Sequence, residues 1–198
     1  MEKQNVLDDV KRILDNDEVI LRNIKPNKKR FILISNLSFA IFFLLFIIPF
    51  TIIGIGGIVG FISFTNETGE KDLLGPIMFL VFASLPLIFF LIKIISVFPI
   101  YKNTYYFVTN KRIIIRSGFI GVDYKALSLK NIIVTNVRVD FLDKLVNPNP
   151  GSIIFGSAAT QLSADQNSKV SSFMFAHIDN PYDEYKTIKE IIDAESAK

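Results

Sequence analysis

Three cationic side chains are the residues whose type and spacing are best suited to binding a ligand. Lys111, Arg112 and Arg116 lie in and just after a predicted hairpin turn. Clustered cations close to a bilayer attract anionic lipid, by about 1 kcal/mol for each charge. The cluster therefore has two interpretations, which are contact with lipid headgroups, or a solvated strand end with one structural arginine.

Residues suited to catalysis or metal binding are few. The chain has no cysteine and one histidine, His177, which excludes thiolate chemistry and histidine-cluster metal sites. His177 lies among apolar residues and is expected to be a half-buried strand residue. Asp140 and Asp143 have no partner nucleophile and are expected to be solvated. Because catalysis needs a positioned acid, base, nucleophile or metal, we predict no enzyme activity, no cofactor and no metal.

The elements that must position these residues begin with a long apolar stretch. Residues 31–64 contain no charged residue, and a second apolar run covers 73–92. Uncharged apolar runs of about 18 residues or more are typical of membrane spans. The sequence therefore predicts a two-helix transmembrane hairpin over residues 31–100, with a short external loop at 65–72.

Charged residues at the ends of the apolar runs predict the orientation of the hairpin. Lys28, Lys29 and Arg30 precede the first run and Lys93 follows the second, whereas the 65–72 loop is net acidic. Basic flanks stay on the cytoplasmic side. We therefore expect a multi-pass protein of a bacterial cell membrane with both termini in the cytoplasm. The formal net charge of +3 is too small to indicate nucleic-acid binding.

Proline and glycine mark special positions in the apolar runs. Pro49 and Pro86 predict kinks. Gly56 and Gly60 form a GxxxG spacing, which lets two helix backbones approach closely. This spacing would pack the two spans together or pair two copies of the chain, so a homo-oligomer is one possible state.

The polar parts of the chain predict short helices and strands. Within residues 1–30 we expect an amphipathic helix near 6–14, lying on the membrane surface or on the protein's own domain, and a strand at 18–24. Residues 101–198 form the predicted cytoplasmic domain. Its expected strands cover 104–109, 112–116, 121–129, 132–139, 151–155 and 172–178, with a long loop at 156–171 and a helix starting at Pro181. The fold class is thus a membrane α-helical hairpin plus an α+β domain with a strongly bent sheet or barrel.

Several stretches resemble the membrane-anchored bacterial pleckstrin-homology-like (PH-like) family. They are residues 17–26, the 105–115 hairpin, residues 127–132, the 151–155 strand and the 178–181 entry to the last helix. The resemblance covers nearly the whole chain and implies a PH-like fold. In eukaryotic PH domains a basic cluster comparable to Lys111, Arg112 and Arg116 holds phosphoinositide headgroups. The family has no single established activity, so the resemblance implies a membrane-tethered interaction module.

Two functional hypotheses from different classes follow from these features. In the first, the hairpin anchors a cytoplasmic scaffold domain that binds a protein partner through the 156–171 loop or an exposed strand edge. In the second, the spans oligomerise through Gly56 and Gly60 into a pore or a membrane-protection protein, with the domain as regulator. Contact of the first hairpin with anionic lipid is a further alternative.

Overall fold

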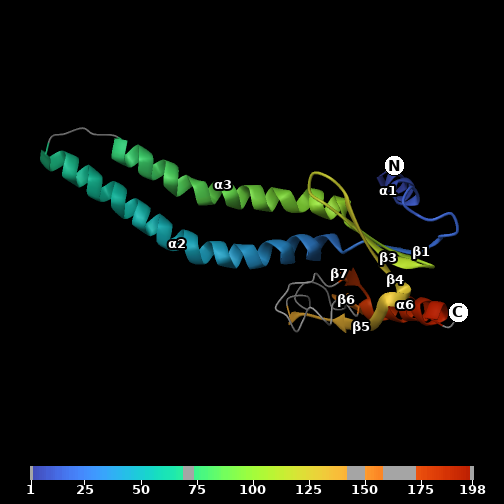
Figure 1. Cartoon of the computed structure of the whole chain (residues 1–198). Helices are drawn as coiled ribbons and strands as arrows, with labels where there is room; N and C mark the ends of the chain where they lie inside the picture. Colours follow the sequence, from blue (N-terminus) through green and yellow to red (C-terminus); the bar gives the residue numbers. More distant parts are fainter. Residues whose placement is uncertain (1, 69–73, 142–149, 158–172, 197–198) are drawn as a thin grey trace. The chain divides into compact units, whose positions relative to one another are not determined.

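The chain forms two compact units. The computed structural model describes residues 2–68, 74–141, 150–157 and 173–196. The folded unit combines the N-terminal residues up to Phe31 with the chain from Ile100 onward, and the helical unit comprises Ile32–Pro99. Figure 1 labels the elements along the chain. Residues 1–30 are predicted as a part separate from the 101–198 domain, but the structure joins them in one folded unit.

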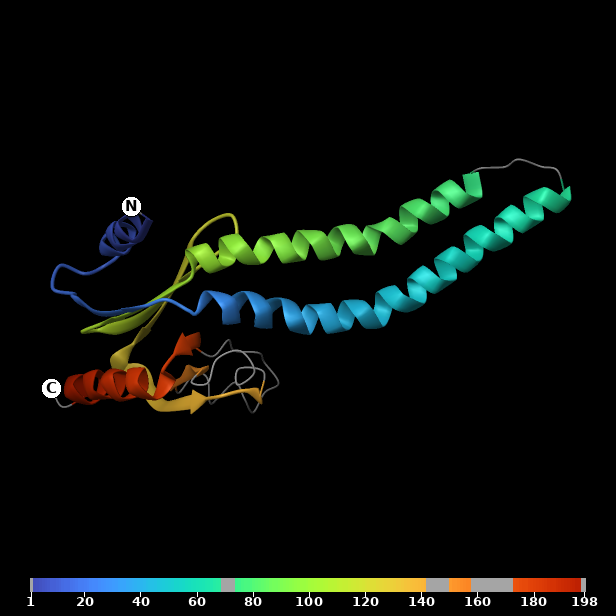
Figure 2. The ribbon, with the colours of Figure 1, turned by 180° about the vertical axis from the view of Figure 1, so that it is seen from behind.

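The helical unit is built by two helices, α2 (Lys28–Thr68) and α3 (Leu74–Asn103). They run side by side in Figure 2, and the ring of Phe90 in α3 stacks on Phe43 of α2 with 4.0 Å between centroids. Pro49 lies inside α2, which continues through it. Both helices are longer than expected, since α2 extends beyond 64 into the predicted loop and α3 extends beyond 92.

One described helix is long and apolar enough to cross a membrane. This candidate span is Lys28–Phe61 of α2, and no part of its most apolar window is buried. Its 34 residues would reach about 50 Å at 1.5 Å per residue, against a hydrocarbon core of about 30 Å. The membrane-spanning character expected of residues 31–100 is therefore supported for one helix and not for the predicted pair.

Four antiparallel strands form the first sheet, in the order β1 (Ile20–Ile24), β2 (Tyr105–Thr109), β3 (Arg112–Ser117) and β4 (Asp123–Ser128). Strand β1 precedes α2 and β2 follows α3, yet Ile24 pairs with Tyr106. The helical unit is therefore an insertion between two neighbouring strands of one sheet.

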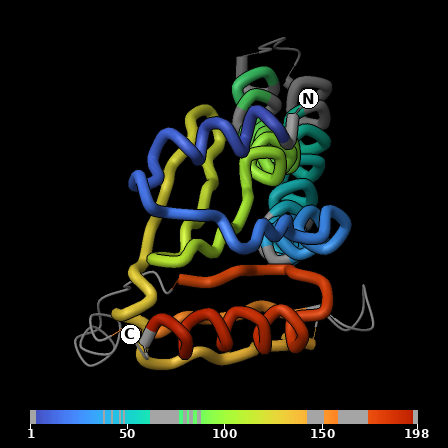
Figure 3. Tube along the Cα trace, turned by 90° about the vertical axis from the view of Figure 1, so that its right-hand side faces the viewer, coloured from blue at the N-terminus to red at the C-terminus, as the bar shows by residue number. Residues whose placement is uncertain are grey.

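Three antiparallel strands form the second sheet, in the order β5 (Ile132–Arg138), β6 (Pro150–Ser157) and β7 (Phe173–Asp179). A short 3-10 helix, η1 (Leu129–Asn131), leads into it from β4, and α6 (Pro181–Ser196) packs against β5 and β6 (Figure 3). The predicted 156–171 loop starts too early, because Gly156 pairs with Val134 and Ser157 with Ile132 in the sheet. The remainder of that loop lies outside the described residues.

The main core lies between the two sheets and α6. It contains Tyr106 and Val108 of β2, Phe155 of β6, Phe175 of β7 and Ile188 of α6. The rings of Tyr106 and Phe175 stack at 4.7 Å. The Tyr106 hydroxyl accepts a hydrogen bond from the Ala176 amide at 3.1 Å and donates to the Ala176 carbonyl at 3.2 Å. Burial, partly offset by the bond to Ala176, raises the pKa of Tyr106 to about 12.

A second core lies on the other face of the first sheet, beneath α1 (Glu2–Lys11). Val6 and Val10 of this helix pack on Tyr105, Phe107 and Ile114. Strand β2 is thus buried on both faces, which explains its unbroken apolar sequence in place of alternation. Of the two positions expected for the N-terminal helix, the structure shows packing on the protein's own domain.

Candidate functional site

The three predicted cations lie together on the β2–β3 hairpin. Lys111 is in the turn, and Arg112 and Arg116 lie on β3, four residues apart. Side chains of a strand alternate between faces, so both arginines share the face of Ile114, which packs beneath α1. The cluster therefore faces the N-terminal segment.

Acidic residues of that segment pair with each cation. Lys111 Nζ lies 2.5 Å from Asp17 Oδ1 and 3.5 Å from Asp15 Oδ2. Arg116 Nη2 lies 3.6 Å from Asp9 Oδ2. The hydrogen bond to Lys111 is the main reason why the pKa of Asp17 is lowered, and the reciprocal bond raises the pKa of Lys111. We call these contacts, together with the Glu18–Arg112 pair described next, the N-terminal clasp.

The pair of Glu18 and Arg112 is the most buried part of the clasp. Arg112 donates from Nε to Oε1 of Glu18 at 2.9 Å and from Nη2 to Oε2 at 2.8 Å. The Glu18 side chain is fully buried and that of Arg112 is 28 % exposed. The Thr109 hydroxyl also donates to Glu18, at 2.7 Å, and the Asp15 amide donates at 3.1 Å. Burial raises the pKa of Glu18, but these hydrogen bonds outweigh it and the net direction is downward.

Arg116 connects the clasp to the end of α3. Its side chain is 6 % exposed, and its Nη1 donates to the Asn103 carbonyl at 3.0 Å. The guanidinium also lies over the Tyr105 ring and donates from Nε to the Tyr124 hydroxyl at 3.4 Å. The Lys111, Arg112 and Arg116 cations are thus engaged by carboxylates and carbonyls of the folded unit itself.

The start of α2 is bonded to β7. Asn27 caps the helix, since its side-chain Oδ1 accepts a hydrogen bond from the Arg30 backbone amide at 3.1 Å. The backbone amide of Asn27 donates to the His177 carbonyl at 2.8 Å. Arg30 is fully buried, and its Nη1 donates to the Ile178 carbonyl at 3.2 Å. Of the basic residues predicted to flank the spans, Arg30 is therefore inside the folded unit, whereas Lys28, Lys29 and Lys93 are exposed.

The other predicted positions fall at scattered places. His177 is half-buried in β7, as expected, with its ring edge-on to Phe31 at 5.9 Å. Asp140 pairs with Arg138 at 2.8 Å, and Asp143 lies outside the described residues.

The GxxxG glycines take no part in the contact between α2 and α3 within the described chain. A Cβ added to Gly56 or Gly60 would meet no atom there within 4 Å. Pairing of two copies of the chain through these glycines stays a prediction.

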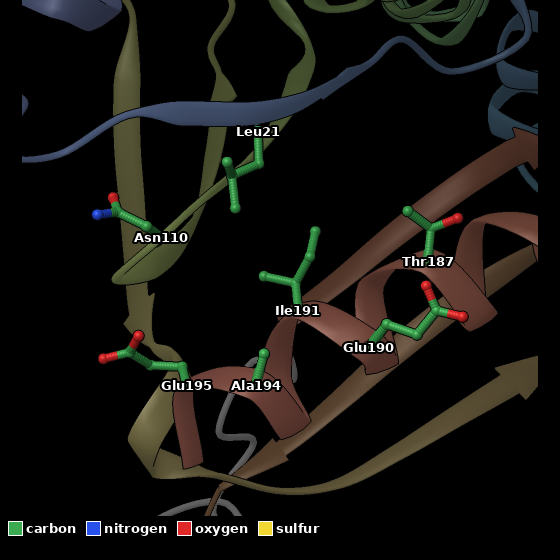
Figure 4. A pocket seen from close by; sticks show the side chains of 7 residues that line it. All are labelled: Leu21, Asn110, Thr187, Glu190, Ile191, Ala194 and Glu195. Atoms are coloured by element: carbon green, nitrogen blue, oxygen red, sulfur yellow. The ribbon is translucent and has the colours of Figure 1, made fainter. Parts of the chain in front are cut away.

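A groove that the sequence did not predict lies between the first sheet and α6 (Figure 4). Its volume is about 280 Å³, and Leu21 of β1 and Ile191 of α6 point toward one another across it. Glu190 and Glu195 make its rim acidic, and Thr187, Ala194 and Asn110 complete it. No spacing pattern in the sequence predicts this groove, because its walls come from opposite ends of the chain.

The groove is open to solvent and is small for a small-molecule pocket. Ligand pockets usually measure about 300–1,000 Å³ and enclose most of the ligand. Leu21 is 46 % exposed, and β1 is an edge strand of its sheet. The arrangement is therefore suited to receiving a side chain from another protein segment.

The family model described as Bacterial PH domain matches residues 34–182. A crystal structure of a DUF1696 family protein with a pleckstrin-homology domain from Shewanella loihica PV-4 is similar at 15 % identity and a TM-score of 0.32, covering 47 % of this chain and 70 % of that one. Among curated proteins, none matches. Because the family match spans most of the sequence, from α2 to the start of α6, the chain belongs to the bacterial PH domain family.

Proposed function

We propose that this protein is a non-enzymatic, membrane-anchored interaction module. In this proposal α2 and α3 cross the cell membrane as a pair, and the folded unit binds a protein partner at its cytoplasmic face. The observation that carries the proposal is the insertion of a long apolar helix between two paired strands of a PH-like domain.

The connectivity of the chain supports two crossings. Because Ile24 pairs with Tyr106, the chain leaves for α2 and returns from α3 at neighbouring strands of one folded unit. A folded unit with a continuous core cannot be divided by a bilayer, so the number of crossings is even. If α2 crosses, the return crossing has to come from residues between Thr68 and Ile100, where α3 is the helix.

The surface of α3 supports the same proposal. The helix has 30 residues, enough to span about 45 Å. Large apolar side chains that are at least 41 % exposed line it: Ile77, Met78, Val81, Leu85, Ile88, Phe89, Leu91, Ile92, Ile95 and Phe98. Exposed apolar surface of this extent is unfavourable in water and favourable in lipid.

Labelling of single cysteines tests the anchoring. The chain has no cysteine, so each introduced thiol is the only one. In intact cells, a membrane-impermeant maleimide is expected to label Asn66→Cys, near the outer end of α2, and to label Lys130→Cys in η1 only after permeabilisation. Labelling of Lys130→Cys in intact cells, or protection of Asn66→Cys, would contradict the proposed topology.

The groove between β1 and α6 is the proposed partner site. Its apolar walls, Leu21 and Ile191, suit an apolar side chain, and the Glu190 and Glu195 carboxylates suit a neighbouring cation. The proposed partner is therefore a protein segment that carries an apolar anchor residue beside a lysine or arginine.

A photo-crosslinking amino acid in place of Leu21 tests the partner site in living cells. We expect an adduct from this position that is lost when Glu190→Lys and Glu195→Lys reverse the rim charge. The matched control replaces Lys130, which is exposed and outside the groove. Equal adducts from both positions, or an adduct insensitive to the charge reversal, would refute the assignment.

A further inference from the structure

The loop between β3 and β4 displays an apolar cluster to solvent. Ile120 is 93 % exposed, more than any other large apolar side chain in the described residues, and Phe119 and Val122 are 48 % and 38 % exposed. Isolated exposed apolar residues are ordinary in proteins. Three within four consecutive positions form a patch that water does not favour.

The loop has a defined conformation. Gly118 has φ +152°, and a Cβ at this position would collide with the Gly121 carbonyl oxygen, so this tight turn requires a glycine. The Gly118 carbonyl accepts a hydrogen bond from the Asn103 side-chain amide at 3.1 Å. Asn103 is in turn held by Arg116, as described above. The apolar side chains therefore lie on a turn whose conformation is fixed by Gly118 and by the hydrogen bond from Asn103.

The hydrogen bond to Asn103 ties the loop to the inner end of α3. Asn103 is the last residue of that helix and follows Pro99, the last residue of the helical unit, by four positions. Four helical residues span about 6 Å. The loop is therefore close to the segment proposed to leave the membrane, whatever the angle between the two units.

Charges near this loop suit an anionic membrane surface. Lys102 in the last turn of α3 is exposed, as is Lys125 in β4, three positions after the loop, and Asp123 is the acidic residue that follows the loop. Apolar side chains flanked by exposed lysines are typical of segments that lie in the headgroup region of a bilayer.

We propose that residues Phe119–Val122 insert into the interfacial region of the cytoplasmic leaflet and form a contact with lipid additional to the membrane helices. This inference rests on the proposed anchoring by α2 and α3. The inserted loop would hold the folded unit in one orientation on the membrane, because a loop contact added to the helix connections restricts rotation about them.

Depth-dependent fluorescence quenching tests the insertion. The full-length protein is reconstituted into vesicles of phosphatidylethanolamine and phosphatidylglycerol, with an environment-sensitive fluorophore on Ile120→Cys. Because Ile120 is almost fully exposed, the substitution and label leave the core intact. We expect a blue-shifted emission and quenching by lipids that carry a spin label, at a depth of about 5–10 Å below the headgroup boundary.

Two further labels separate the failure of this inference from the failure of the anchoring. Lys130→Cys lies past the opposite end of the six-residue strand β4, about 20 Å from the loop by strand rise, and is expected to stay aqueous. Ile55→Cys, on the exposed surface of α2, reports whether that helix is in lipid. Quenching at 55 and 120 but not at 130 supports the inference.

Other quenching patterns contradict either the loop insertion or the anchoring by the helices. If the label at 55 is quenched and the label at 120 behaves like that at 130, the loop does not insert, although the anchoring stands. If the label at 120 is shielded from water but insensitive to the lipid quenchers, the loop contacts protein and the inference is wrong. If the label at 55 is not quenched, the anchoring itself fails.

Discussion

Replacing Arg112 with methionine is expected to release the N-terminal segment from the β2–β3 hairpin. The change removes both hydrogen bonds to the buried Glu18 carboxylate and the bond from Arg112 Nη2 to the Ile13 carbonyl at 2.8 Å. Methionine keeps the unbranched stem of the arginine side chain, as far as the position of Nε. The expected effect is therefore electrostatic and leaves the packing of β3 nearly unchanged.

The size of the free-energy loss in Arg112→Met depends on the hydrogen bonds that Glu18 retains. Removing one partner of a buried ion pair costs about 3–5 kcal/mol. Glu18 would keep its hydrogen bonds from Thr109 and Asp15, so the lower end of that range applies. The unpaired Glu18 carboxylate can also become protonated. From its ordinary pKa of 4.5 this protonation costs about 3.4 kcal/mol at pH 7, which limits the penalty of burying the unpaired charge. We expect a loss of about 3 kcal/mol, which corresponds to roughly a 150-fold increase in local opening.

Hydrogen exchange of the full-length protein in lipid nanodiscs measures this loss. Peptides covering residues 2–18 are expected to exchange roughly two orders of magnitude faster in Arg112→Met, whereas peptides of α6 keep their protection. Arg138→Met is the matched control, because Arg138 forms a pair of the same 2.8 Å length with Asp140 at an exposed position. Exposed pairs contribute about 1 kcal/mol or less. If both variants exchange alike, the clasp does not hold the segment.

Three further perturbations probe the fold and the clasp. Tyr106→Phe is expected to lower stability by about 1–3 kcal/mol, seen as faster amide exchange in β7, because it removes the partner of the part-buried Ala176 amide and carbonyl. Gly151→Ala is expected to lower the melting temperature, since its Cβ would lie 2.8 Å from Pro181 Cγ. Acid is expected to open the clasp, because the pKa of Glu18 is lowered on folding. The stabilisation by Glu18 is complete at pH values above its ordinary pKa of 4.5 and is lost as the pH falls through the folded pKa. The measurement is the rise in amide exchange of residues 2–18.

Matched variants accompany these three tests. Tyr182→Phe removes a hydroxyl from an exposed tyrosine and should leave stability unchanged. Gly156→Ala, in the same strand as Gly151, makes only ordinary contacts at 3.5 Å. Glu18→Gln should flatten the acid response, and an acid response that persists in this variant would show that other groups open the segment.

The strands and helices were predictable where a local sequence pattern indicates them. Every expected strand is present within a few residues of its predicted bounds, because turn residues such as Asn110 and Gly118 interrupt β-rich runs. The bounds of α2 and α3 were less predictable. Apolar residues continue beyond Lys93 as far as Ile100, and α3 runs through Pro99 to Asn103, so neither the lysine nor the proline marks its end.

The partners of the charged residues were not predictable, since they depend on pairing across the whole chain. The sequence places Asp15 and Asp17 between an expected helix and an expected strand that starts at Glu18, and it gives Lys111 and Arg112 either as lipid contacts or as a solvated strand end. Only the pairing of β1 with β2 brings these groups together, across more than 90 positions of sequence. A cationic cluster is a candidate for ligand binding only after the carboxylates of its own chain have been placed.

The start of α2 and the end of α3 are bonded to different sheets of the folded unit. The start of α2 is held by β7 of the second sheet, through Asn27 and Arg30. The end of α3 is held by β3 of the first sheet, through Asn103 and Arg116. A displacement of one helix end relative to the other would therefore act on the junction of the two sheets, where Tyr106 makes its hydrogen bonds to Ala176. Those two bonds and the ring stacked on Phe175 join β2 to β7, so Tyr106 is one of the core side chains that would resist such a displacement.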